Sequence, residues 1–102
     1  MITLKPGGTR PAPEATLKSN GAPVDLSGAS VRFVMVGQGL TIDRQAEIVD
    51  AASGVVRVVF EPGDTDTPGQ YHAEFEATYS DGRKETYPSH GYLTVQILPD
   101  LG

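Results

Sequence analysis

Apolar and polar residues alternate with a period of two along much of the chain, which is the pattern of β-strands that bury one face. The clearest stretch runs from Gln70 to Ser80, and Ala29 to Val36 alternates in the same way. Val55 to Phe60 is dense in β-branched residues, which favour strands. The apolar face of the clearest stretch consists of Tyr71, Ala73, Phe75, Ala77 and Tyr79. These patterns predict a sheet with one buried face and one solvated face.

Short apolar runs separated by glycine, proline and asparagine make up the rest of the chain, and no stretch shows sustained helical periodicity. Leu40 to Asp43 and Ala46 to Asp50 are either two short strands or one strand bent around Arg44. Gly37 to Gly39 is expected to be a turn. The other expected strands are Ile2 to Leu4, Glu14 to Lys18, Lys84 to Tyr87 and Tyr92 to Leu98. About seven strands at this spacing predict an all-β fold, an immunoglobulin-like antiparallel β-sandwich.

The N-terminal residues form a separate element in this scheme. A short apolar strand is followed by Lys5 to Pro13, where three prolines and two glycines predict an extended arm. We therefore divide the chain into an arm, residues 1–13, and a sandwich domain, residues 14–102. The strand in the arm pairs either with its own sheet or with the exposed edge of a neighbour. Ile2, Leu4 and Arg10 are the candidate residues of an assembly interface.

Composition narrows the classes of function. The chain has 102 residues, enough for one domain, and 38% of them are hydrophobic. It has no cysteine, which excludes disulfides and thiolate chemistry. The net charge of -5 argues against binding to nucleic acid or to an anionic membrane surface. No apolar run approaches the roughly 20 residues needed to span a bilayer, and the N-terminus lacks the apolar core of a signal peptide. We expect a soluble protein that is not exported.

The most specific local pattern is Gly69-Gln70-Tyr71, which follows a loop rich in proline, glycine and aspartate. In immunoglobulin-like domains a tyrosine at this place donates a hydrogen bond back to the preceding corner. Gly69 and Tyr71 are therefore expected to form a structural corner. The alternative is a calcium loop built on Asp64 and Asp66, since Ca²⁺ requires several oxygen ligands.

No set of residues has the spacing of a catalytic or cofactor site. His72 lies on the polar face of its strand, and His90 lies in a loop, so both are expected at the surface. Glu74 and Glu76 share a solvated strand face. The glycine pairs are not followed by the helix that a phosphate-binding loop requires. We therefore predict that the chain is not an enzyme and uses no metal or cofactor.

Four segments resemble the immunoglobulin-like domain at the N-terminus of phage baseplate upper proteins. They are Val24 to Met35, Gly54 to Val58, Asp64 to Phe75 and Tyr79 to Pro88. The likeness is one of turns and alternation, and it covers roughly residues 17–97. It implies a β-sandwich in the virion of a tailed phage, where such domains attach fibres or receptor-binding parts to the tail. The long C-terminal extension that is frequent in the family has no counterpart after Leu98.

The resemblance leads to a functional hypothesis. The chain is expected to be a structural component of the virion, in the tail, the baseplate or a head decoration, acting through protein–protein contacts. Its partners would be other phage structural proteins, with several copies in a symmetric assembly. It would be made in the cytoplasm of the host bacterium. The alternative is a module that binds carbohydrate or a host surface, with an aromatic platform drawn from Tyr79, Tyr87 and Tyr92.

Overall fold

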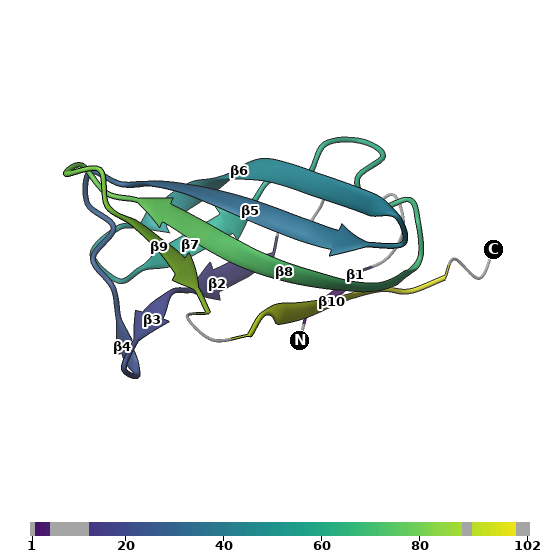
Figure 1. The fold of residues 1–102 in the computed structure, drawn as a ribbon, viewed down its shortest axis with the longest axis horizontal. Coiled ribbons are helices and arrows are strands. Elements are labelled where there is room, and N and C mark those ends of the chain that lie inside the picture. Colours follow the sequence, from purple (N-terminus) through teal and green to yellow (C-terminus); the bar gives the residue numbers. More distant parts are fainter. Residues whose placement is uncertain (1, 5–12, 89–90, 100–102) are drawn as a thin grey trace.

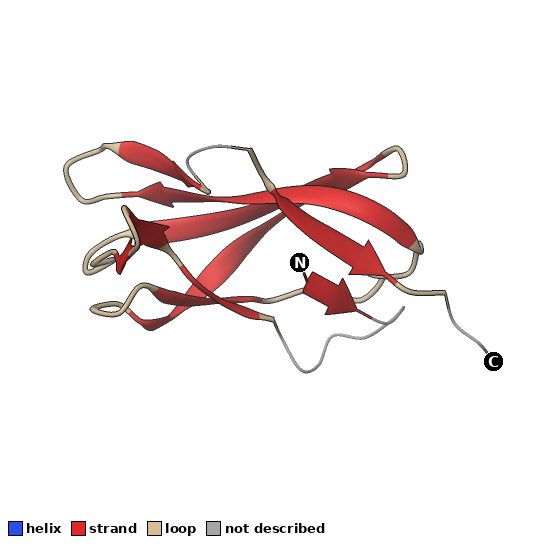
Figure 2. Cartoon of the chain, turned by 90° about the horizontal axis from the view of Figure 1, so that it is seen from below, coloured by secondary structure: helices blue, strands red, loops and turns tan. Residues whose placement is uncertain are grey.

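A computed structural model describes residues 2–4, 13–88 and 91–99. These residues form strands and connecting loops (Figures 1 and 2), and no helix in them is long and apolar enough to cross a membrane. The strands are β1 (Ile2–Leu4), β2 (Glu14–Thr16), β3 (Lys18–Ser19), β4 (Ala22–Pro23), β5 (Ser30–Gly37), β6 (Leu40–Asp50), β7 (Val55–Val58), β8 (Gly69–Thr78), β9 (Lys84–Tyr87) and β10 (Leu93–Ile97). The all-β prediction is confirmed.

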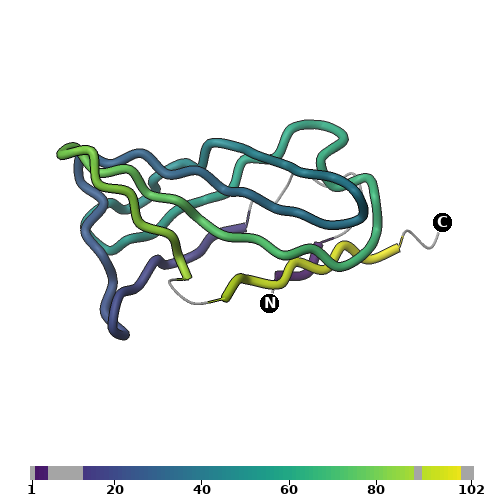
Figure 3. Tube along the Cα trace, viewed as in Figure 1, coloured from purple at the N-terminus to yellow at the C-terminus, as the bar shows by residue number. Residues whose placement is uncertain are grey.

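One large sheet contains eight of the strands, in the order β1-β10-β8-β5-β6-β7-β2. Strand β9 pairs with β8 outside this order, and β3 and β4 form a small hairpin. All pairs in the large sheet are antiparallel except β1 with β10, which run parallel. The long hairpin β5–β6 and strand β8 run side by side along the long axis of the molecule (Figure 3). The sheet is thus mixed, with a single parallel pair at one edge.

Strand β6 is one continuous strand, which decides between the two alternatives left open by the sequence. Its pairing with β5 runs without interruption from Leu40 to Ala46. The irregularity lies further along, where the register with β7 shifts between Ile48 and Asp50. Such a bulge bends a strand without ending it. Arg44 therefore lies inside the strand, on the row of residues that otherwise faces the core.

The core is formed by the inward rows of the long strands. Phe33 of β5 and Phe75 of β8 face each other across the pair, with ring centroids 5.1 Å apart. Phe60, which follows β7, meets Phe33 edge to face at 6.0 Å. Each of these side chains is nearly inaccessible to solvent. Burying a side chain of this size stabilises the fold by about 2–3 kcal/mol.

The sheet curls so that its two ends approach each other. Ala15 and Leu17, at the β2 end, line the same apolar cavity as Tyr87 and Leu93, at the β9 and β10 end. The cavity measures about 200 Å³. The fold is therefore a sandwich made by one curled sheet, and an open seam runs between β2 on one side and β9 and β10 on the other.

Candidate functional site

Tyr71 lies at the corner where the chain enters β8. Its side chain is 0% exposed, and its hydroxyl donates a hydrogen bond of 2.6 Å to the backbone carbonyl of Thr67. Burial raises the pKa of Tyr71 above its ordinary value, while the hydrogen bond to Thr67 acts in the opposite direction. The bond ties the loop before β8 to the buried face of the strand.

The turn between β5 and β6 packs against this corner. A Cβ atom on Gly37 would lie 2.7 Å from the carbonyl oxygen of Gln70 and 2.8 Å from the ring of Tyr71. Gly69 has a φ of 141°, and a Cβ atom there would lie 2.5 Å from the side chain of Gln38. At Gly37 the clash is with backbone and a buried ring, which cannot move aside, so this position requires glycine. At Gly69 the side chain of Gln38 can move, and it is the positive φ that favours glycine. The predicted turn at Gly37 to Gly39 is present and closes on Tyr71.

A bidentate ion pair joins β6 to the loop before the corner. The guanidinium group of Arg44 donates two hydrogen bonds of 2.8 Å, one to each carboxylate oxygen of Asp64. Asp64 is 8% exposed and also accepts a 2.8 Å hydrogen bond from the backbone N–H of Glu61. Burial opposes ionisation of Asp64, but the bonds from Arg44 and Glu61 outweigh it and hold the pKa of Asp64 below its ordinary value.

Sequence reasoning missed this pair. Arg44 and Asp64 are 20 positions apart, and only Asp64 had been considered for a role. The available signal was the place of Arg44 between Ile42 and Ala46, on the apolar row of an alternating strand. An arginine in that phase requires a buried or half-buried acceptor.

The alternative of a calcium site in this loop depended mainly on Asp64, whose carboxylate is engaged by Arg44. Both oxygens of Asp64 are already hydrogen-bonded, and Asp66 is exposed. Within residues 2–4, 13–88 and 91–99, no three histidine, aspartate or glutamate side chains gather in a group that could hold a metal ion. The arrangement around Asp64 is that of a structural ion pair.

Strand β1 lies in the sheet of its own domain. Ile2, Thr3 and Leu4 pair with Val95, Gln96 and Ile97, and the N–H of Leu98 donates to the carbonyl of Leu4 at 2.8 Å. The side chains of Ile2 and Leu4 are half-buried and pack against the core cluster. The outer edge of β1 has no partner among the described strands. Arg10, the third candidate interface residue, lies outside the described residues.

The three tyrosines considered as a sugar platform do not share a surface. Tyr87 is buried and donates a 2.7 Å hydrogen bond to Glu85, while Tyr79 is half-buried and bonds the hydroxyl of Tyr87. Tyr92 is 58% exposed and stacks on the ring of His72, with centroids 3.9 Å apart. His72 is at the surface, as expected, and His90 lies outside the described residues.

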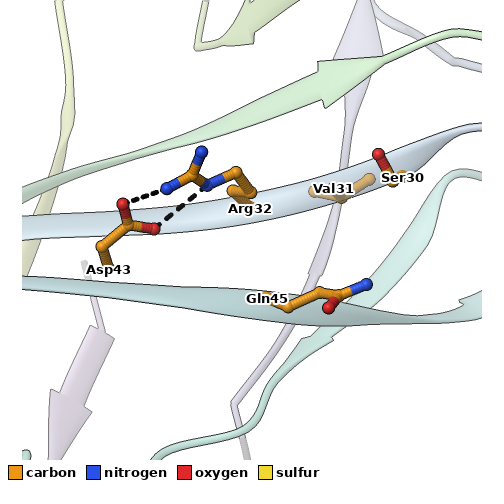
Figure 4. A pocket seen from close by; sticks show the side chains of 5 residues that line it. All are labelled: Ser30, Val31, Arg32, Asp43 and Gln45. Carbon is orange, nitrogen blue, oxygen red and sulfur yellow. Dashed lines mark hydrogen bonds and ion pairs between the residues drawn. The ribbon is translucent and has the colours of Figure 1, made fainter.

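A shallow hollow of about 480 Å³ lies on the outer face of β5 and β6 (Figure 4). Its main feature is an ion pair between Arg32 and Asp43, in which the Nε of Arg32 donates to Asp43 at 3.1 Å. The hydrogen bonds to Asp43 raise the pKa of Arg32 above its ordinary value. Ser30 and Gln45 complete the polar lining. The two charged groups in the hollow are thus paired with each other.

The chain resembles known proteins along nearly its whole length. A family model described as the BppU N-terminal domain matches residues 13–91. The C protein alpha-antigen of Streptococcus agalactiae is 31% identical in an alignment of 103 positions that covers 93% of this chain. The chain spans only about a tenth of that protein, since the match covers 10% of it.

Two solved structures share the fold. The N-terminal domain of phage TP901-1 ORF48 superposes with a TM-score of 0.68 and 18% identity, covering 95% of this chain and 83% of that one. A putative glycoside hydrolase from Bacteroides vulgatus gives a TM-score of 0.53 and 14% identity, covering 98% of this chain and 17% of that one. At these identities the likeness concerns the fold. With the family match, it establishes that the chain belongs to the family of BppU N-terminal domains, as the resemblance in its turns and strands had indicated.

Proposed function

We propose that this chain is a structural component of a tailed-phage virion, in the tail, the baseplate or a head decoration, and that it acts through protein–protein contacts. The observation that carries the proposal is the family match over residues 13–91. The fold shared with a phage N-terminal domain, over 83% of that domain, supports it. In this proposal the domain works through its surfaces and edges, uses no cofactor and is not an enzyme.

The partners in this proposal are other structural proteins of the virion and further copies of the chain. The net charge of -5 suits contacts with proteins better than contacts with nucleic acid or anionic lipid. One candidate contact is the outer edge of β1, together with Arg10 in the arm. Exposed backbone groups on an edge strand accept a strand from a neighbour. Synthesis in the host cytoplasm and incorporation into the particle complete the proposal.

The direct test is the protein composition of purified particles. Virions of the phage that encodes the chain are purified and digested, and peptides of the chain are quantified by mass spectrometry against a known tail protein. The proposal expects a fixed number of copies per particle. Absence from particles that contain their other structural proteins would overturn it. If the chain is present, cross-linking from Lys5 and Lys18 in the intact particle would identify the neighbouring proteins.

A second candidate function, binding to carbohydrate or to a host surface, is favoured by one observation. Tyr92 presents an exposed ring beside His72, and sugars stack on such rings. A glycan array with the wild-type chain and with Tyr92→Ala tests it. Binding that is lost in the variant would support this function, and an array without binding would remove it.

A further inference from the structure

One long edge of the sheet has no partner strand among the described residues. Strand β2 is the last strand of the large sheet. The chain continues from β2 almost directly into β3 of the small hairpin, so residues 14–19 run as one extended segment. Along one side this segment pairs first with β7 and then with β4. The other side faces the open seam of the sandwich. This edge, residues 14–19, is called the β2–β3 edge.

The hydrogen bonds show which backbone groups point toward the seam. The carbonyl of Pro13 accepts a hydrogen bond from the N–H of Val58, on the β7 side. The N–H of Leu17 donates to the carbonyl of Gly54, and the carbonyl of Leu17 accepts from the N–H of Val24. The backbone groups of Pro13 and Leu17 therefore point toward β7 and β4, away from the seam. In an antiparallel ladder the direction alternates from one residue to the next. The N–H and C=O groups of Glu14, Thr16 and Lys18 therefore point outward, to the free side. Their side chains are exposed as well.

We propose that the β2–β3 edge pairs with the same edge of a second copy of this chain, antiparallel and centred on Thr16. Residues that face each other across an antiparallel pair have a constant sum of numbers, here 32. Thr16 then faces Thr16 of the partner subunit, and Glu14 faces Lys18 of the partner subunit. This register places all the outward-pointing groups opposite one another, so each facing pair exchanges two hydrogen bonds.

Charge favours the same register. The twofold axis places a carboxylate opposite an ammonium group at both ends of the pair, and opposite charges facing each other across strands are stabilising. Glu14 is available for this contact: its side chain is 53% exposed, and its distance to Arg57 is 3.9 Å, too long for a hydrogen bond. A shift by two residues in either direction loses a facing pair and separates Glu14 from Lys18 of the partner subunit.

The added strand would also cover an apolar opening. The cavity of about 200 Å³ lies directly beside the edge and is lined by Ala15 and Leu17. On the same face of the extended sheet, Ala15 would lie next to Leu17 of the partner subunit. An isologous pairing of this kind closes after two copies. It would supply one symmetric contact between copies of the chain, and its role in a particle rests on the proposed function.

The test is the oligomeric state of the full chain, measured by sedimentation equilibrium over a wide range of concentrations. The wild-type chain is expected to form a dimer. Glu14→Lys places like charges opposite each other twice and should raise the dissociation constant about tenfold. Lys18→Glu should do the same, and the double variant Glu14→Lys/Lys18→Glu should restore dimerisation. Thr16→Pro removes an outward N–H and should abolish the dimer.

The control is Glu47→Lys, which makes the same change of charge on the interior strand β6. Glu47, like Glu14, contacts Arg57, at 3.7 Å, so this control reproduces the loss of that contact without touching the edge. Thermal melts of every variant confirm folding. Hydrogen exchange should show that the amides of Thr16 and Lys18 become protected as concentration rises.

A monomer at all concentrations, or a dimer that is indifferent to the edge variants, would overturn the inference. Neither result bears on the proposed function, because a monomeric chain can still be present in purified particles. Conversely, a dimer that responds as expected would stand even if the particles lacked the chain, although its role in a virion would then fall.

Discussion

The two halves of the molecule are held together in different ways. Around Tyr71 the strands are long, and the core, the ion pair of Arg44 and the turn at Gly37 all constrain the same corner. At the two ends of the sheet order, β1 and β2 have three residues each and one partner strand each, and their inward side chains are half-buried. The corner is held by several contacts at once, whereas the outer sides of β1 and β2 have no partner among the described strands. We therefore expect the corner to govern stability and, under the proposed function, the short edges to meet neighbouring proteins.

The largest effect should come from the core that supports the corner. Phe33→Ala removes a ring that contacts both Phe60 and Phe75, and it should lower the free energy of unfolding by about 3–5 kcal/mol. Urea denaturation followed by circular dichroism measures it. The matched control is Phe33→Leu, which keeps most of the volume and should lose much less. A small loss in Phe33→Ala would mean that this core does not carry the stability assigned to it.

The next effect concerns the ion pair. Asp64→Ala removes the acceptor of two hydrogen bonds from the guanidinium of Arg44 and of one from the N–H of Glu61, and it should cost about 2 kcal/mol, the range for hydrogen bonds to charged groups. The same denaturation experiment measures it. Asp66→Ala, in the same loop but exposed, is the control and should change little. Equal losses in the two variants would contradict the role given to Asp64.

The sequence was sufficient to identify strands wherever one face is apolar and the other is not. Gln70 to Ser80 and Ala29 to Val36 were located to within two residues because every inward position of the two strands is apolar. It also placed Tyr71 two residues after a glycine, at the corner. However, the periodicity of apolar residues does not show which strands pair with each other. Nothing in Ile2 to Leu4 indicates a parallel pairing with β10, because that pairing joins opposite ends of the chain.

The same limit explains the missed ion pair and the edge. The link between Arg44 and Asp64 exists because the loop after β7 folds back over β6, and local propensities do not contain that contact. Likewise, Glu14 to Lys18 could be identified as a strand from the sequence, but the side of it that lacks a described partner became visible only once β7 and β4 were found on the other side. The alternation of apolar and polar residues therefore could not predict the role of residues whose partners are brought close only by the tertiary fold.

Lowering the pH should remove the stabilisation that the ion pair of Arg44 and Asp64 provides. The pKa of Asp64 is lowered in the folded state, so its contribution to stability is present above its unfolded pKa, near 3.8, and is lost as the pH falls through the folded value. Denaturation midpoints of the wild-type chain and of Asp64→Ala, measured from pH 6 to pH 2, test this. The two curves should converge in acid. Curves that stay parallel over this range would refute the pKa shift.

A smaller effect is expected from the hydroxyl of Tyr71. Tyr71→Phe keeps the ring in the core and removes only the bond to Thr67, so the loss should be on the order of 1 kcal/mol. Thermal denaturation is sensitive enough for this difference. The control is Tyr92→Phe, whose hydroxyl is on an exposed side chain. An unchanged melting midpoint in Tyr71→Phe would refute the corner assignment.

The smallest effect on folding, and the most informative for assembly, is expected at β1. Leu4→Ala removes a half-buried side chain at the edge of the core cluster, so it should cost about 1 kcal/mol, well below Phe33→Ala. Deleting Met1 to Arg10 should leave a folded domain, because the other strands keep their partners, but should reduce incorporation into particles. Circular dichroism of the deletion measures folding, and mass spectrometry of particles that carry it measures incorporation. If the deletion variant does not fold, β1 is needed for the stability of the domain. If the variant folds and is incorporated into particles at the normal level, the arm has no role in assembly.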